Sequence, residues 1–182
     1  IQRFRDMTDQ AMAIPGLGLV VWPESGYNAY VRAGANLTGG VAKEVSVPML
    51  VGVLRYEPVE GGRPKVWNSV AAVAVGGEAH AFYDKVMLLV FGEYIPGYET
   101  FPGFFKWLHQ KKILPYLAVY ERGQTLAPLP VGAYRLSADV CYEDILPRHI
   151  RDLMGPMDEA GTRPHAMVNV TNDSWYGPAE PP

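Results

Sequence analysis

The sequence contains one cysteine, Cys141, so no disulfide can form within the chain. This excludes the small secreted domains that depend on several disulfides. The lysines and arginines form no basic block, and the net charge of −3 excludes the basic surface of a typical nucleic-acid-binding protein. No apolar run approaches the roughly 20 residues that cross a bilayer as a helix, and the N-terminus carries no signal-peptide pattern.

The apolar content is high enough for a packed core. Of the 182 residues, 48% are hydrophobic, and no internal repeat interrupts the chain, so we expect a single domain over residues 1–182. The chain begins with Ile1 rather than methionine and stops soon after a motif. We therefore expect a partial domain, cut from a longer chain at both ends.

Short apolar runs bounded by glycine and proline predict β-strands. They cover residues 17–22, 47–56, 66–75, 79–83, 134–142 and 166–170. The third and fourth runs flank Gly76-Gly77 and predict a hairpin. Amphipathic segments predict helices over 3–13, 37–45 and 144–154. Strands that alternate with helices indicate an α/β fold.

Three polar residues stand at the ends of predicted strands. Glu24 follows the first strand, Lys85 follows the hairpin, and Cys141 closes the strand 134–142. In α/β folds, functional groups gather at such strand ends because a rigid sheet holds the loops there. A thiol becomes a strong nucleophile when a desolvated carboxylate takes its proton, and an ammonium can stabilise an oxyanion. Together the three residues suit acyl transfer through a thioester.

Each of these residues also has an ordinary structural interpretation. A lone cysteine in an apolar strand is usually a small buried core residue. Glu24 can cap a helix or lie in a solvated turn, and Lys85 can form an exposed ion pair with Asp84. Spacing alone does not favour catalysis over these alternatives, so the surrounding motifs decide.

Four motifs surround the three residues in a fixed order. They are Trp22-Pro23-Glu24; Tyr83-Asp84-Lys85 with Phe91-Gly92-Glu93-Tyr94-Ile95-Pro96; Cys141-Tyr142-Glu143; and Asn169-Val170-Thr171-Asn172-Asp173-Ser174-Trp175-Tyr176-Gly177. In this order they resemble the carbon–nitrogen hydrolase (nitrilase) superfamily, whose triad is Glu, Lys and Cys. The segments after the lysine and after the cysteine are similar to those of its apolipoprotein N-acyltransferase branch.

The resemblance implies a fold and a cellular place. The fold would be the α-β-β-α sandwich of the nitrilase type, here incomplete at both ends and without the flanking transmembrane regions. The catalytic domain would lie on the periplasmic side of the bacterial inner membrane. Its acyl donor would be a phospholipid and its acceptor the N-terminal amine of a diacylglyceryl-cysteine lipoprotein. No cofactor or metal is needed, and no nucleic-acid partner is expected.

The resemblance also assigns roles to residues. Cys141 would carry the acyl group as a thioester, Glu24 would act as base and acid, and Lys85 would hold the oxyanion with a backbone N–H near Cys141. Supporting or substrate-binding positions fall on Glu93, Tyr142 and Glu143. Glu93 would orient Lys85 or assist proton transfer, and the other two flank the nucleophile.

Three stretches call for separate interpretation. Residues 86–90 lack the Leu-Val-Pro run that is common in the family, and Asp139 stands where an apolar residue is common. The aromatic-rich stretch 91–120 can be a lid or arm that touches acyl chains or the membrane surface, with lysines near anionic headgroups. Alternatively, its aromatic side chains simply pack on the domain.

Two further functions compete with acyl transfer to an amine. A soluble nitrilase-type amidase would use the same triad and transfer the acyl group to water. A non-catalytic interaction domain would keep the fold, but an intact triad argues against it. A Cys141–His149 dyad is disfavoured because no cysteine-protease signature surrounds either residue, and no pair of the four histidines has metal-site spacing.

Overall fold

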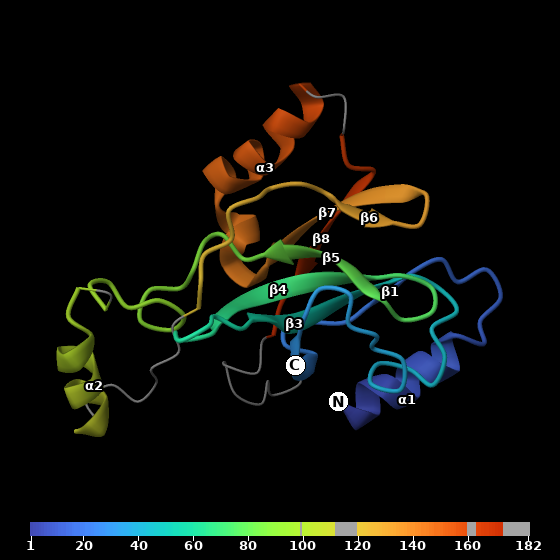
Figure 1. Cartoon of the computed structure of the whole chain (residues 1–182). Helices are drawn as coiled ribbons and strands as arrows, with labels where there is room; N and C mark the ends of the chain where they lie inside the picture. Colours follow the sequence, from blue (N-terminus) through green and yellow to red (C-terminus); the bar gives the residue numbers. More distant parts are fainter. Residues whose placement is uncertain (99, 112–119, 160–162, 173–182) are drawn as a thin grey trace, which may run out of the picture.

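The computed structural model describes residues 1–98, 100–111, 120–159 and 163–172. These residues form two β-sheets that pack face to face, with helices on the outer sides (Figure 1). Helix α1 (Gln2–Ala11) lies beside the first sheet, and α3 (Pro147–Glu159) covers the second. The α-β-β-α order expected from the sequence is therefore confirmed.

The first sheet is built around a long central hairpin. Its strands are β1 (Val20–Val21), β2 (Tyr27–Val31), β3 (Met49–Glu57), β4 (Lys65–Val73) and β5 (Ala79–Asp84). Strands β3, β4 and β5 run antiparallel, whereas β1 and β2 both pair with β3 in parallel. Glu24 lies in the short segment between β1 and β2, and Lys85 directly follows β5.

The second sheet contains β6 (Leu129–Val131), β7 (Tyr134–Val140) and β8 (Ala166–Val170). Strands β6 and β7 form an antiparallel pair, and β8 joins β7 in parallel with Asp139 opposite Asn169. A short 3₁₀ helix, η1 (Cys141–Ile145), begins where β7 ends, and α3 follows it. The second sheet thus delivers Cys141 at the carboxyl end of its central strand.

The alternating side chains of β3 and β4 explain why the sheets form layers. Met49, Val51 and Val53 point to one core, which also contains Trp22 and the buried part of the loop 32–47. Leu50 and the neighbouring side chains of β4 point the other way, into the core between the two sheets. Both faces of this hairpin are buried, so its strands read as continuous apolar runs.

Helix α1 attaches to the chain just before Glu24. The Trp22 ring lies 5.5 Å from the Phe4 ring, centroid to centroid, and its indole N–H donates a hydrogen bond of 2.8 Å to Thr8 Oγ1. A buried indole with a satisfied N–H is a rigid anchor. It fixes the backbone immediately ahead of Pro23-Glu24.

The sequence predicted most strands correctly and one helix wrongly. The predicted helix at 37–45 does not form. Gly39 adopts a φ of 81°, and Leu37 N–H donates a hydrogen bond to Gly77 O in the turn between β4 and β5. Leu37 and Val41 are nevertheless buried in the core. The predicted helix at 144–154 begins later, at Pro147, because η1 precedes it. Strands β2 and β6 and helix α2 (Pro102–Gln110) were not predicted.

Two glycines allow the backbone to approach closely at the strand ends. A Cβ on Gly52 in β3 would lie 2.1 Å from Pro23 O and 2.7 Å from Glu24 Cα. A Cβ on Gly123 would lie 2.0 Å from Asp84 O, and Gly123 N–H donates to Lys85 O at 2.9 Å. The segments that carry Glu24 and Lys85 are therefore packed directly against backbone rather than side chains.

No helix among the described residues is long and apolar enough to cross a membrane.

Substitution of Gly52 by alanine should displace the segment that carries Glu24. Because the new methyl group overlaps backbone atoms of Pro23 and Glu24, we expect the free energy of unfolding to fall by about 1–3 kcal/mol in urea denaturation. Gly103→Ala is the matched control, since a Cβ there meets open space and favours helix α2. Equal stability of the two variants would contradict the close approach at Gly52.

Candidate active site

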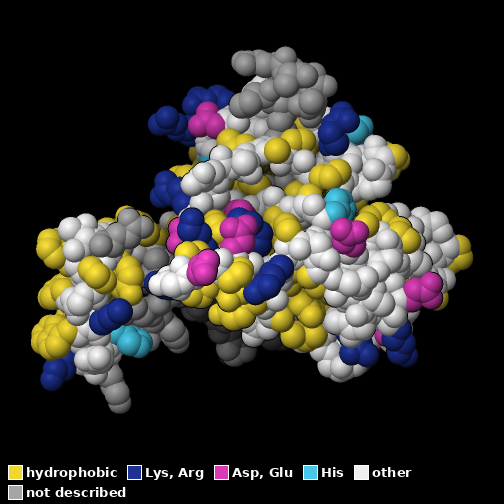
Figure 2. All heavy atoms as spheres, in the orientation of Figure 1, with side chains coloured by type: hydrophobic (Ala, Val, Ile, Leu, Met, Phe, Trp, Pro, Cys, Tyr) yellow, Lys and Arg dark blue, Asp and Glu magenta, His cyan; other side chains and the backbone are white. Residues whose placement is uncertain are grey.

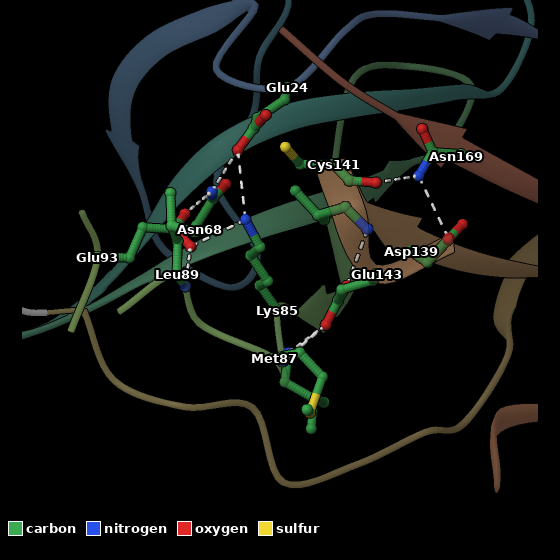
Figure 3. A network of polar contacts seen from close by, with 12 residues as sticks. Glu24, Asn68, Lys85, Met87, Leu89, Glu93, Asp139, Cys141, Glu143 and Asn169 are labelled. Atoms are coloured by element: carbon green, nitrogen blue, oxygen red, sulfur yellow. Dashed lines mark hydrogen bonds and ion pairs between the residues drawn. The ribbon is translucent and has the colours of Figure 1, made fainter. Parts of the chain in front are cut away.

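Cys141 occupies a sharp turn between β7 and η1. Its φ is +58°, in the left-handed region that non-glycine residues rarely adopt. Such a conformation persists only when the surroundings hold it, and it is frequent at functional sites. A nucleophile on a strained strand-to-helix turn presents its side chain at the end of the sheet. In Figure 3 the Cys141 sulfur points toward the Glu24 carboxylate.

Glu24 is a buried carboxylate with few partners. Its Oε1 accepts a hydrogen bond of 2.7 Å from Asn68 Nδ2 and lies 3.8 Å from Lys85 Nζ. Among the described residues, Oε2 has no hydrogen bond of normal geometry, although the backbone of Asn172 lies close enough to stabilise the charge. Burial raises the pKa of Glu24, and the contacts to Asn68 and Lys85 offset part of that rise. A raised pKa suits a carboxylate that must accept a proton.

Lys85 is only 2% exposed and lies between two carboxylates. Its Nζ is 2.8 Å from Glu93 Oε2 and 3.8 Å from Glu24 Oε1. The ammonium also lies 5.2 Å from the centre of the Tyr142 ring, within the range of a cation–π contact. Lys85 therefore joins the first sheet to the residue that follows Cys141.

The alternative of an exposed Lys85–Asp84 pair does not hold. Asp84 instead binds Arg55, whose guanidinium Nη2 lies 2.8 Å from Asp84 Oδ2 and whose Cζ lies 3.8 Å from the centre of the Trp67 ring. Asp84 and Lys85 are adjacent in the chain but belong to different networks, because successive residues of a strand point to opposite faces.

Asn68 was not predicted from the sequence, yet it ties the two carboxylates together. Its Nδ2 donates to Glu24 Oε1 and to Glu93 Oε1, both at 2.7 Å. Glu93 Oε2 in turn accepts a hydrogen bond from Leu89 N at 3.0 Å, which folds the loop after Lys85 over the cluster. An asparagine in the middle of an apolar strand was the available signal, since a buried amide requires partners.

Glu143 is completely buried and acts as an anchor between the two sheets. Its Oε1 accepts hydrogen bonds from Val86 N and Met87 N, both at 2.8 Å. Its Oε2 accepts from Val140 N at 2.8 Å and from Tyr83 Oη at 3.0 Å. One carboxylate thus binds the backbone just before Cys141 to the backbone just after Lys85 (Figure 3).

The histidine nearest in sequence to the cysteine has other partners. His149 Nε2 lies 3.2 Å from Tyr83 Oη and 3.7 Å from Glu143 Oε1. His149 therefore contacts Tyr83 and the Glu143 anchor from α3. Within the described part of the chain, no group of three or more His, Cys, Asp or Glu could hold a metal ion.

The structure brings the predicted site residues to one place. Glu24, Lys85 and Glu93 form one connected cluster, and Tyr142 touches it through Lys85. Glu143 is buried, and its hydrogen bonds go to Tyr83 and to backbone N–H groups rather than to this cluster. The end of the fourth motif, residues 173–177, lies outside the described residues.

Removal of the Glu143 charge should destabilise the protein. Glutamine in place of Glu143 turns an amide N–H₂ toward one pair of the N–H and O–H donors that Glu143 binds. Either Val86 N–H and Met87 N–H then lose their acceptor, or Val140 N–H loses its acceptor while the Tyr83 hydroxyl can turn and accept. We expect Glu143→Gln to lower the free energy of unfolding by about 2–4 kcal/mol, measured by urea denaturation. Glu44→Gln, at an exposed carboxylate, should have no measurable effect. A wild-type denaturation midpoint for Glu143→Gln would contradict the anchor role.

The relatives of this chain in sequence are acyltransferases. It is 30% identical to the apolipoprotein N-acyltransferase of Geobacter metallireducens, with 98% of this chain and 32% of that protein covered. The same enzyme of Bdellovibrio bacteriovorus is also 30% identical, with coverage of 97% and 32%. The chain therefore spans about one third of the length of these relatives. No protein-family model matches it.

Solved structures share the fold at low identity. A nitrilase-superfamily amidase from Nesterenkonia matches with a TM-score of 0.52 and 19% identity, over 97% of this chain and 63% of that one. A carbon–nitrogen hydrolase from Helicobacter pylori matches with a TM-score of 0.52 and 12% identity, over 93% and 55%. The chain has the carbon–nitrogen hydrolase (nitrilase) fold, and along nearly its whole length it is similar to part of the apolipoprotein N-acyltransferases.

Proposed function

We propose that this chain is part of the catalytic domain of an N-acyltransferase that carries a fatty acyl group on Cys141. The observation that supports this most directly is the buried cluster in which Lys85 lies between Glu24 and Glu93, beside the turn that presents Cys141. A base, an electrophile and a nucleophile at one place are the three components of acyl transfer.

The first half-reaction would load the cysteine. Glu24 takes the thiol proton, and the Cys141 sulfur attacks the carbonyl carbon of a phospholipid ester. Lys85 stabilises the negative charge on the carbonyl oxygen in the tetrahedral intermediate. The C–O bond then breaks, the leaving alkoxide takes the proton from Glu24, and a lysophospholipid departs from the thioester.

The second half-reaction would transfer the acyl group from Cys141 to an amine. A neutral amine attacks the thioester carbonyl, and Glu24 accepts a proton from the attacking nitrogen. The C–S bond breaks, the Cys141 thiolate leaves and regains a proton, and an amide is formed. Glu93 positions Lys85 in both half-reactions. Glu93 Oε2 lies 2.8 Å from the Lys85 ammonium, and Glu93 Oε1 accepts a hydrogen bond from Asn68.

The substrates and location follow from the relatives and remain part of the proposal. Because those relatives are apolipoprotein N-acyltransferases, we assign a phospholipid as donor and the N-terminal amine of a diacylglyceryl-cysteine lipoprotein as acceptor. The chain would then work on the periplasmic side of the bacterial inner membrane.

Helix α2 offers a surface for membrane contact. None of its residues is buried, and it stands apart from the sandwich in Figure 1. Phe101, Phe104 and Trp107 share one face at a spacing of three residues and are all exposed. Figure 2 shows hydrophobic and basic side chains together on this helix, which includes Lys106. An exposed aromatic face with nearby lysines is typical of a helix that binds an anionic membrane surface.

A soluble amidase is the second candidate, because one solved protein that shares the fold is an amidase. One structure of the Nesterenkonia amidase carries acrylamide added to its active-site cysteine. A similar triad in this chain would release the acyl group to water. The acceptor, rather than the triad, separates the two functions.

Mass spectrometry of the complete protein should detect the acyl intermediate. After incubation with a phospholipid, we expect Cys141 to gain the mass of one acyl group, and Cys141→Ala to gain none. Glu24→Gln should slow the loading by at least about 100-fold, because the thiol loses its general base.

The fate of the thioester then distinguishes the two candidates. A diacylglyceryl-cysteine peptide should remove the acyl group from Cys141 much faster than water does. Faster clearance by water, together with turnover of small amides, would favour the amidase. Undiminished acyl transfer by Cys141→Ala would rule out both.

Loss of the α2 aromatic face should weaken binding to membranes. We expect the double variant Phe104→Ser/Trp107→Ser to bind anionic liposomes at least about tenfold more weakly in a sedimentation assay, because two large apolar side chains no longer enter the interface. Tyr134→Ser is the control, since Tyr134 is 61% exposed, against 55% for Phe104 and 49% for Trp107, but lies on β7. Similar binding by both variants and the wild type would refute the membrane role of α2.

A further inference from the structure

The turn at Cys141 is held from two sides. On the side before it, Val140 N–H donates to Glu143 Oε2 at 2.8 Å. On the side after it, the Cys141 carbonyl oxygen accepts a hydrogen bond of 2.8 Å from Asn169 Nδ2. Since the positive φ of Cys141 is intrinsically unfavourable by about 1–3 kcal/mol, both contacts help to maintain it.

Asn169 reaches the Cys141 carbonyl from the neighbouring strand. Strands β7 and β8 are parallel, and Asn169 stands directly opposite Asp139 in the register. Its Nδ2 donates both to the Cys141 carbonyl and to Asp139 Oδ2, the latter at 3.2 Å. Figure 3 shows the amide nitrogen between these two acceptors.

The Asp139 carboxylate helps to fix the orientation of the Asn169 side-chain amide. Asn169 is exposed, so water competes for its side chain, and the amide can rotate unless a second contact selects one orientation. Ionised Asp139 accepts hydrogen bonds and donates none. Together with the Cys141 carbonyl oxygen, which also only accepts, it selects the orientation in which N–H₂, and not the amide oxygen, faces both acceptors.

We propose that Asn169 is a positioning residue that fixes the backbone of the nucleophile turn through the Cys141 carbonyl, and that Asp139 is its orienting partner. The proposal deepens the proposed function, because it rests on Cys141 as the reactive group. It also gives a role to Asp139, a fully buried carboxylate in β7. Asp139 Oδ1 has no hydrogen-bond partner among the described residues, so the contact with Asn169 is made through Oδ2.

The surroundings of Asp139 make this arrangement sensitive to pH. Burial raises the pKa of Asp139 to about 6, and the hydrogen bond from Asn169 opposes that rise. The other titratable groups that act on it, or on which it acts, come from three elements: Glu143 and Asp144 on η1, His149 on α3, and Tyr83 on β5. Above the raised pKa the carboxylate is ionised and orients the amide. As the pH falls through about 6 it gains a proton, can donate to the amide oxygen, and no longer selects one orientation.

Alkylation of Cys141 by iodoacetamide tests the proposal without any acyl substrate. The rate is measured on the complete, folded protein by peptide mass spectrometry between pH 5 and 8. We expect Asn169→Leu, which has a similar size but no N–H, to react at least about tenfold more slowly at pH 7.5, because the thiol moves away from its base. Asn169→Thr, which keeps one donor on a strand-forming residue, should recover much of the rate.

The pH profile separates orientation from mere stability. Asp139→Asn, whose amide can donate as well as accept, should react several-fold more slowly than the wild type at pH 8, and the ratio of wild-type to Asp139→Asn rates should fall toward 1 as the pH drops through about 6. Glu24 is present in both proteins, so its own protonation cancels in this ratio. A constant ratio would overturn the role of Asp139, and a wild-type alkylation rate in folded Asn169→Leu would overturn the role of Asn169.

The positioning role of Asn169 and the proposed acyltransferase function can fail independently. If the wild type forms no thioester with phospholipid while Asn169→Leu still slows alkylation, the acyltransferase fails and the positioning role stands. If the thioester forms at equal rates in both proteins and alkylation is unchanged, the positioning role fails and the acyltransferase stands.

Discussion

The burial of one ammonium group organises this site. Lys85 is withdrawn from water almost completely, and an unpaired charge in such a place would be very unfavourable. It is tolerated because Glu93 and Glu24 both lie within 4 Å of its Nζ. The two carboxylates come from loops far apart in the chain, so the need to neutralise Lys85 draws those loops together. Asn68 completes the arrangement by bonding to both of them.

The nucleophile is positioned by a separate set of contacts in the second sheet. Glu143 ties the turn at Cys141 to the backbone after Lys85, so the two sheets are joined at the point where chemistry would occur. The membrane-facing role proposed for α2 does not depend on this framework, because that helix stands outside the sandwich. Catalysis and membrane contact would thus reside in parts that differ in how tightly they are packed.

The sequence predicted the sheets and the strand-end residues because both leave local signals. Long apolar runs marked β3 and β4, and Glu24, Lys85 and Cys141 stood out as polar residues that follow such runs. Asn68 and Asn169 lie inside strands, where only the three-dimensional pairing reveals what their amides contact. The segment 37–45 was misjudged because its apolar spacing suits a helix, whereas its glycines and its bonds to the turn at Gly77 decide the outcome. Tertiary hydrogen bonds overrode local periodicity there.

The pairing of one cation with two acidic groups has a consequence for the energetics of the first step. With Glu24 and Glu93 ionised, the cluster carries one excess negative charge. When the proton passes from the Cys141 thiol to Glu24, that charge moves to sulfur, but the total within the pocket is unchanged. Creating a thiolate in a poorly solvated place is normally opposed by desolvation. Here the same step removes a buried carboxylate charge as it forms the thiolate, so the low dielectric penalises the starting state and the activated state to a similar degree.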